Sequence, residues 1–303
     1  LNGDGDKRDL VAHAYRSDTG TIRNLGLATT FQDPYPAGNG FVAFLVHEQL
    51  QGNVDLNRDS DTTDIVVFVY DGPSDTARNL RLAARRFDFN PQTVLEAGGR
   101  RLAFHVGEEP QGRRNLNGDF DLNDFVLHVY DVDSESVENL HLAATDAKVS
   151  GAHVAFRVPE DSQGDQDLTG DGDTNDRVLF VHDPRTHQTS SSGASAEQRY
   201  ELAQDVCLFE SHESHDFFGD DLNGDGDTGD RILRVFGWAS GRVLDIGLAL
   251  GAFSDPARSL TARRHVLFNV GEEEQGASDL NGDGDVRDSV LHVARIDEIT
   301  RLR

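Results

Sequence analysis

An acidic, glycine-rich loop occurs six times along this chain, and a short apolar segment follows each copy. The copies lie at 1–9, 55–64, 115–124, 167–176, 221–230 and 279–288, and from 55 onwards they begin 60, 52, 54 and 58 residues apart. A repeat of that length indicates one supersecondary unit copied around a ring or along a stack. Because repeats share a continuous core, we expect a single domain, 1–303, of six repeats of about 55 residues.

Each repeat is expected to consist of β-strands. Short segments rich in Val, Leu, Phe and Tyr, bounded by Gly, Asp and Ser clusters, are typical of strands. In the repeat over 141–197 these segments are 147–150, 153–158 and 177–182, and the acidic loop lies between the last two. A Ser-rich segment up to Ser195 stands where other repeats have a fourth strand, and it is interpreted as a flexible connection that could carry O-glycans.

Four short antiparallel strands in about 55 residues, repeated about six times, predict an all-β fold: a six-bladed β-propeller of four-stranded antiparallel blades. The acidic hairpin loop then lies between the second and third strand of each blade. A calcium β-roll would need its motifs in tandem at about nine residues. Residues 1–30 supply only a third and a fourth strand, so the first blade is expected to be incomplete, with its inner strands before Leu1 in the natural polypeptide. Residues 299–302 are expected to complete the last blade.

The second strands share a tripeptide of a hydrophobic residue, a second residue that is mostly Ala, and Phe, and each is followed by the third strand. This pattern resembles the six-bladed propellers of the TolB type, which are built from WD40-like repeats. The resemblance covers essentially the whole chain and implies a fold, not an activity. The acidic loop is a departure from that family. The matching tripeptides begin at Val42, Leu102, Val154, Cys207 and Val266.

The acidic loop has the composition of a calcium site. Numbered by its own positions, its consensus has aspartate at positions 1, 5, 7 and 10, asparagine at position 3, and glycine at positions 4 and 6. Ca²⁺ takes six to eight oxygen ligands, and the two glycines let the chain curl around it. The start of the loop resembles EF-hand and dockerin loops, whereas its closing acid resembles integrin-type loops with one residue more. Hairpin turns also favour Asp, Asn and Gly, but a turn does not need the same acids at positions 1, 5, 7 and 10.

We therefore predict about six Ca²⁺ sites, with ligands at loop positions 1, 3, 5, 7 and 10. Asn115 and Thr169 replace stronger ligands, and Arg58 and Ser60 replace both glycines of the second loop, so these loops are expected to be weaker sites. The predicted metal ligands are Asn2, Asp4, Asp6, Asp9, Asp55, Asn57, Asp59, Asp61, Asp64, Asn115, Asn117, Asp119, Asp121, Asp124, Asp167, Thr169, Asp171, Asp173, Asp176, Asp221, Asn223, Asp225, Asp227, Asp230, Asp279, Asn281, Asp283, Asp285 and Asp288.

A glutamate precedes five of the loops by seven or eight residues, and in four cases Gln-Gly follows it. At the end of the second strand it could brace the loop by accepting backbone N–H bonds, which is the favoured interpretation, or close the metal shell directly. These residues are Glu48, Glu108, Glu160, Glu213 and Glu272.

The charge of the chain limits its partners. It has 54 acidic and 28 basic residues and a formal net charge of -26, which disfavours nucleic acid and anionic membranes. No apolar stretch approaches twenty residues, so no membrane span is predicted. The single cysteine, Cys207, lies in an apolar run and is interpreted as a small buried hydrophobe.

The fifth repeat breaks the pattern. Its glutamate is followed by a longer segment with His212 and His215, which is either a solvated loop or a transition-metal or acid/base site. Trp238 is expected to pack on the outer strand. Three histidines share a third-strand register with Phe68, Phe180 and Arg234, and this interchange predicts packing rather than ligation. They are His13, His128 and His292.

These features favour a non-enzymatic, calcium-stabilised binding or structural module, with a protein, a glycan or another copy as partner. Millimolar calcium would favour an extracellular, cell-surface or periplasmic location. One alternative is a calcium-dependent hydrolase of the lactonase or phosphoesterase kind, with an axial metal. Another is a lectin-like module in which Trp238, Phe217 and Phe218 line a shallow pocket.

Overall fold

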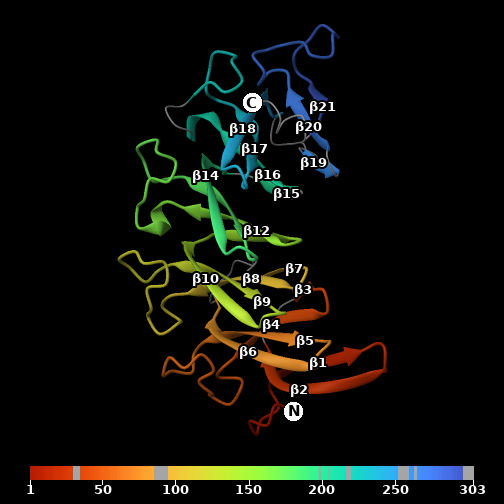
Figure 1. The fold of residues 1–303 in the computed structure, drawn as a ribbon, viewed down its shortest axis with the longest axis vertical. Helices are drawn as coiled ribbons and strands as arrows, with labels where there is room; N and C mark the ends of the chain where they lie inside the picture. Colours follow the sequence, from red (N-terminus) through yellow and green to blue (C-terminus); the bar gives the residue numbers. More distant parts are fainter. Residues whose placement is uncertain are drawn as a thin grey trace. The chain divides into compact units, whose positions relative to one another are not determined.

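The computed structural model describes residues 1–29, 35–84, 95–197, 199–203, 205–215, 220–251, 259–262 and 265–295. Their regular elements are β-strands and two short 3-10 turns, Asp161–Gln163 and Glu213–His215 (Figure 1). No helix in these ranges is long and apolar enough to cross a membrane. The chain separates into two compact units. The first holds Leu1–Val154, Ser162–Gly164 and Asp183–His187, and the second holds Ala155–Asp161, Asp165–His182 and Gln188–Arg303.

The strands pair into antiparallel sheets. In the first compact unit, one sheet has the order β1-β2-β4-β5-β6, with β3 pairing with β4, and another has the order β10-β9-β8-β7. The strands are β1 (Leu10–Arg16), β2 (Thr21–Thr29), β3 (Ala37–Gly38), β4 (Phe41–His47), β5 (Ile65–Asp71), β6 (Thr76–Ala83), β7 (Leu95–Gly98), β8 (Arg101–Gly107), β9 (Phe125–Asp131) and β10 (Ser136–Ala143).

Later in the chain the sheet orders are β11-β12-β13-β14, β15-β16-β17-β18 and β19-β20-β21. The strands are β11 (Asp146–Ser150), β12 (His153–Pro159), β13 (Arg177–Asp183), β14 (Gln188–Ser195), β15 (Tyr200–Ala203), β16 (Val206–His212), β17 (Arg231–Gly237), β18 (Arg242–Ala249), β19 (Ser259–Ala262), β20 (His265–Gly271) and β21 (Ser289–Arg295).

The structure confirms the all-β prediction, and three of the antiparallel sheets in the described part of the chain have the predicted four strands. The segments predicted as strands in the fourth repeat are β11, β12 and β13, and the acidic loop lies between the second and third strand, as in the repeats before and after it. The Ser-rich segment is not a flexible connection, because it forms strand β14. Residues 299–302 lie outside the described part of the chain.

The second and third strands of each sheet form the core. Phe44 lies opposite Phe68, and Phe104 lies opposite His128, with ring centroids 5.9 and 5.8 Å apart. His128 is buried, which lowers its pKa to about 4, so it packs as a neutral ring, as its register with phenylalanine predicted. Cys207 is fully buried, and Trp238 packs against the cluster that contains it. This core holds the two strand ends from which each loop projects.

Candidate metal centre

The carboxylate at loop position 1 holds the curl of the backbone. Asp221 accepts hydrogen bonds from the N–H groups of Gly224 and Gly226 at 2.6 and 2.9 Å, and the first aspartates of the second, fourth and sixth loops do the same. In the second loop, Arg58 and Ser60 take the positive φ angles, 67° and 85°, that glycine takes elsewhere. The second loop therefore keeps its curl at a cost of about 1–2 kcal/mol per residue.

A buried glutamate braces each of the five later loops from beneath. The Glu160 carboxylate accepts hydrogen bonds from the N–H groups of Leu168, Thr169 and Asp176 at 2.6, 2.9 and 3.2 Å. The equivalent glutamates are also fully buried and accept the same three bonds. The glutamate therefore joins the start of the loop to its end, which is the bracing role that the sequence favoured.

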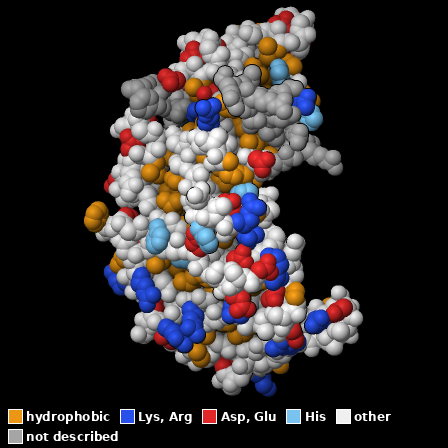
Figure 2. All heavy atoms as spheres, in the orientation of Figure 1, with side chains coloured by type: hydrophobic (Ala, Val, Ile, Leu, Met, Phe, Trp, Pro, Cys, Tyr) orange, Lys and Arg blue, Asp and Glu red, His pale blue; other side chains and the backbone are white. Residues whose placement is uncertain are grey.

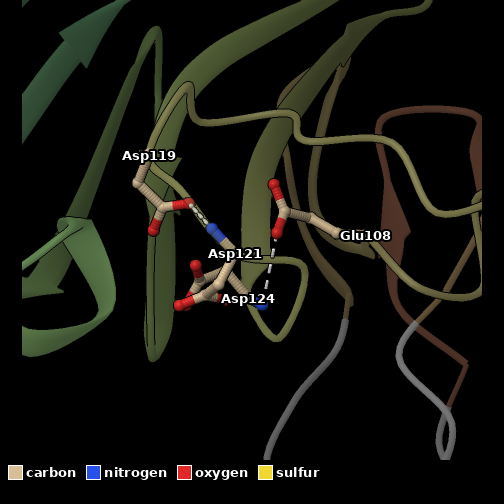
Figure 3. A group of neighbouring side chains, drawn as sticks. All are labelled: Glu108, Asp119, Asp121 and Asp124. Atoms are coloured by element: carbon tan, nitrogen blue, oxygen red, sulfur yellow. Dashed lines mark hydrogen bonds between the residues drawn. The ribbon is translucent and has the colours of Figure 1, made fainter.

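The structure brings the glutamate together with the aspartates at loop positions 7 and 10. In the third loop, Glu108, Asp119, Asp121 and Asp124 form one group whose ligand atoms all lie within 4.8 Å of one another (Figure 3). Further groups include Asp4, Asp6 and Asp9; Glu48, Asp61 and Asp64; Glu160, Asp173 and Asp176; and Glu213, Asp227 and Asp230. The position-1 aspartates are not members of these five groups.

The asparagine at position 3 adds an amide to the group. Asn57 is 5% exposed, and its Nδ2 donates to Asp64 Oδ2 at 2.9 Å and to the Pro110 carbonyl at 3.1 Å. Its Oδ1 is buried and accepts no hydrogen bond from the residues that the structure describes. Leaving a buried acceptor unsatisfied costs about 1–3 kcal/mol. The amide of Asn57, which bonds the Asp64 carboxylate through Nδ2, therefore carries an unused oxygen.

The carboxylate at position 10 is difficult to ionise without a cation. Burial, together with the neighbouring aspartates, raises the pKa of Asp64, Asp124 and Asp230 to about 7. The same burial raises the pKa of Asp176 to about 6. Each centre therefore crowds negative charge in a place where a divalent cation would offset it.

The fourth loop differs from the others at this point. Thr169 stands at position 3, and its hydroxyl contacts Glu160 and Asp167 at 3.2 and 3.4 Å. The ring Nδ1 of His215, from the fifth repeat, lies 3.2 Å from Asp176 Oδ1. The rings of His212 and His215 meet edge to face, with centroids 5.6 Å apart. The sequence shows both Thr169 and the histidine-containing segment of the fifth repeat as exceptions to the pattern, but it does not show that they lie at the same site.

Comparisons with known proteins give little further identification. No protein-family model matches the sequence, and no curated protein matches it. Among solved structures, the β-propeller domain of the Trilobed protease from Pyrococcus furiosus is 8% identical, with a TM-score of 0.42 over 86% of this chain and 67% of that one. The tricorn protease is 11% identical, with a TM-score of 0.41 over 94% and 25%, respectively. An acylaminoacyl peptidase is 8% identical, with a TM-score of 0.41 over 88% and 38%. Similarities at this level assign no activity to the chain.

Proposed function

We propose that this chain is a calcium-stabilised, six-bladed β-propeller of a single domain that serves as a binding or structural module rather than an enzyme. The observation that carries the proposal is the unsatisfied Oδ1 of Asn57, whose amide Nδ2 bonds Asp64 in the group formed by Asp64, Asp61 and the buried Glu48. Short antiparallel sheets in series, three of them four-stranded with such a loop between the second and third strand, support the proposal, because four-stranded antiparallel sheets are the units from which propellers are built.

The chemistry of these groups favours calcium among common cations. The ligand atoms are carboxylate and amide oxygens, which are hard ligands that suit Ca²⁺. Glycines and left-handed residues shape the loop so that several oxygens from one short segment face inwards. Asp61 and Asp64 would provide charge, Asn57 a neutral oxygen, and Glu48 would orient the backbone. When bound, the cation would supply positive charge that offsets the charge of these carboxylates.

Location and partner follow from the metal in this proposal. Millimolar calcium outside the cytoplasm would fill even weak sites, so we propose an extracellular, cell-surface or periplasmic setting. Figure 2 shows acidic and basic side chains interspersed on one face in spite of the net charge of -26. Such a mixed surface favours a protein or glycan partner, or self-assembly, over a strongly charged polymer. Phe217 and Phe218, which the lectin hypothesis would use, lie outside the described residues.

Calcium titration tests this proposal. Isothermal calorimetry on chelator-stripped protein should detect several bound ions, and melting should shift upwards with calcium. A site filled at a hundredfold excess over its Kd contributes about 2.7 kcal/mol. Magnesium at the same concentration is the control, because its octahedral preference suits these loops less well. A melting temperature that neither chelator nor calcium moves at neutral pH would contradict the proposal.

A further inference from the structure

In the first, second, third and fifth loops, the asparagine at position 3 donates both to its own loop and to the following repeat. The acceptor in its own loop is the carboxylate at position 10, and Asn117 has Asp119 Oδ2 as a further acceptor there, at 3.2 Å. The acceptor in the following repeat is a backbone carbonyl in the turn, two residues after that repeat's buried glutamate. The pairs of distances are 3.0 and 2.9 Å for Asn2 (Asp9, Leu50), 2.9 and 3.1 Å for Asn57 (Asp64, Pro110), 3.1 and 3.2 Å for Asn117 (Asp124, Ser162), and 3.1 and 3.1 Å for Asn223 (Asp230, Glu274).

The loop and the following turn are also closely packed. A Cβ atom added to Gly112, in the turn of the third repeat, would lie 2.9 Å from Cβ of Asp59 in the second loop. Gly112 also has a φ of 70°, so glycine is needed there for two reasons. The neighbouring Gln111 accepts a hydrogen bond from the Ala83 N–H at 2.6 Å, which ties the same turn to the end of β6. The loop therefore has a fixed surface to dock on.

The chemistry of the side chain explains why asparagine occupies this position. An amide offers two N–H donors and one carbonyl oxygen. In Asn57 both acceptors lie on the Nδ2 side, so Oδ1 alone is left for a cation. Aspartate would provide an oxygen for the cation, but it could donate to neither Asp64 nor Pro110. One residue thus joins the centre to the neighbouring repeat.

We propose that Asn57 couples cation binding in the second loop to the docking of the third repeat's turn. A cation on Oδ1 fixes the plane of the amide, and this plane aims the Nδ2 donor at the turn carbonyl. Calcium would then act on the junction between the second and third repeats as well as within the second loop. This inference rests on the proposed function, because it needs the loops to bind a cation.

The fourth junction provides an internal contrast. Thr169 has a single hydroxyl donor and cannot make both bonds of an asparagine. The residue two positions after the fifth repeat's glutamate is His215, and its side chain bonds Asp176 directly. This hydrogen bond between His215 and Asp176 joins the loop to the next turn without a position-3 amide. Calcium should therefore affect the fourth junction less than the second.

Hydrogen exchange measured by mass spectrometry tests the coupling in the second loop. Amides in the following turn are hydrogen-bonded, as with Gln111 N–H to the Gly107 carbonyl and Arg114 N–H to the Glu108 carbonyl, at 3.0 and 3.1 Å. In the wild-type protein, calcium should slow exchange over 109–114 by about tenfold, a typical coupling between sites. In Asn57→Asp the slowing should fall below about twofold, while native mass spectrometry counts as many bound ions as in the wild type.

Asn53→Asp is the matched control, because it adds the same charge to an exposed residue of the same repeat, where a φ of 57° is tolerated by aspartate. It should retain the tenfold slowing. If calcium still slows hydrogen exchange tenfold in Asn57→Asp, the coupling is wrong. It is also wrong if the wild-type protein binds calcium but exchange in its turn does not change. Neither result contradicts the proposed function. A wild-type protein that binds no ion overturns the proposed function as well. If Asn57→Asp folds poorly, exchange in the wild-type protein is compared at the turns after the second and the fourth loop, over 109–114 and 213–215. Equal slowing by calcium at both turns overturns the coupling, and slowing at the second junction alone supports it.

Discussion

The third and fourth loops share a buried glutamate and aspartates at positions 5, 7 and 10, but they join the following repeat by different chemistry. In the third loop, the Asn117 amide donates to Asp124 and to the Ser162 carbonyl. In the fourth, Thr169 turns to Glu160, and the His215 ring bonds Asp176 instead. The comparison teaches that position 3 and the turn about 50 residues later change together, so the junction, rather than the loop alone, is the structural unit.

The largest expected effect on stability comes from the buried glutamate that both loops share. Glu108→Gln and Glu160→Gln keep the shape of the side chain but remove the charge that accepts three backbone N–H bonds. Hydrogen bonds to a charged group contribute about 1.5–3 kcal/mol each. We expect each variant to lose about 2–3 kcal/mol in urea unfolding at saturating calcium. Glu109→Gln, with a side chain 71% exposed, is the control and should lose little; equal losses in all three would refute the bracing role.

The next effect concerns pH and separates the two loops. The pKa of Asp124 is raised to about 7 and that of Asp176 to about 6, so the folded protein holds these protons more tightly than the unfolded chain. Their contribution to stability is complete below about pH 4 and is lost as pH rises through the folded pKa. As pH rises in calcium-free buffer, the stability of the wild type should therefore fall relative to that of Asp124→Asn until about pH 7. Relative to Asp176→Asn, it should fall only until about pH 6.

Chemical denaturation at a series of pH values in calcium-free buffer measures this difference. The asparagine variants serve as their own controls, because the amide does not titrate. Saturating calcium should reverse the slope, since a cation binds only the ionised carboxylate. Parallel stability curves for the wild type and Asp124→Asn from pH 4 to 7 would show that Asp124 does not have the environment described.

A smaller effect is expected where the fourth junction replaces amide with imidazole. His215 is 46% exposed, so its bond to Asp176 is partly screened by water. We expect His215→Ala to lower the stability by less than about 1 kcal/mol and to increase proteolysis near the fifth repeat's turn. In the variant Thr169→Asn/His215→Ala, the restored amide should recover the loss. If the double variant is no more stable than His215→Ala, the asparagine amide and the histidine ring are not equivalent at this junction.

The smallest effect should come from position 6 of the third loop. Phe120 replaces the glycine or serine of the other loops, and its side chain is fully exposed. Phe120→Ser should change stability by less than about 0.5 kcal/mol, as expected for a surface site. Calorimetric calcium binding by this variant should match the wild type, because the side chain touches none of the carboxylates. A large loss of affinity would mean that the loop conformation depends on the ring.

The strands could be predicted because alternating apolar residues and bounding Gly, Asp and Ser are local signals. The loop curl was also local, since Asp221 and the glycines around it interact within six residues. The brace could be inferred from the regular spacing of Glu160 to its loop. Two features could not be predicted. The first is that the Asp55 carboxylate accepts hydrogen bonds from backbone N–H groups, which the spacing of the loop residues does not reveal. The second is the contact of His215 with Asp176, which joins residues 39 positions apart.

The most direct test of the central claim is the location of every calcium ion in a crystal grown at millimolar calcium, from anomalous scattering. We expect peaks inside the acidic loops, in contact with the position-7 and position-10 aspartates, and with Asn57 Oδ1 as a ligand in the second loop. The buried glutamates should remain bonded to the backbone N–H groups. Loops free of ions at that concentration, with Asn57 Oδ1 still without a partner, would contradict the account.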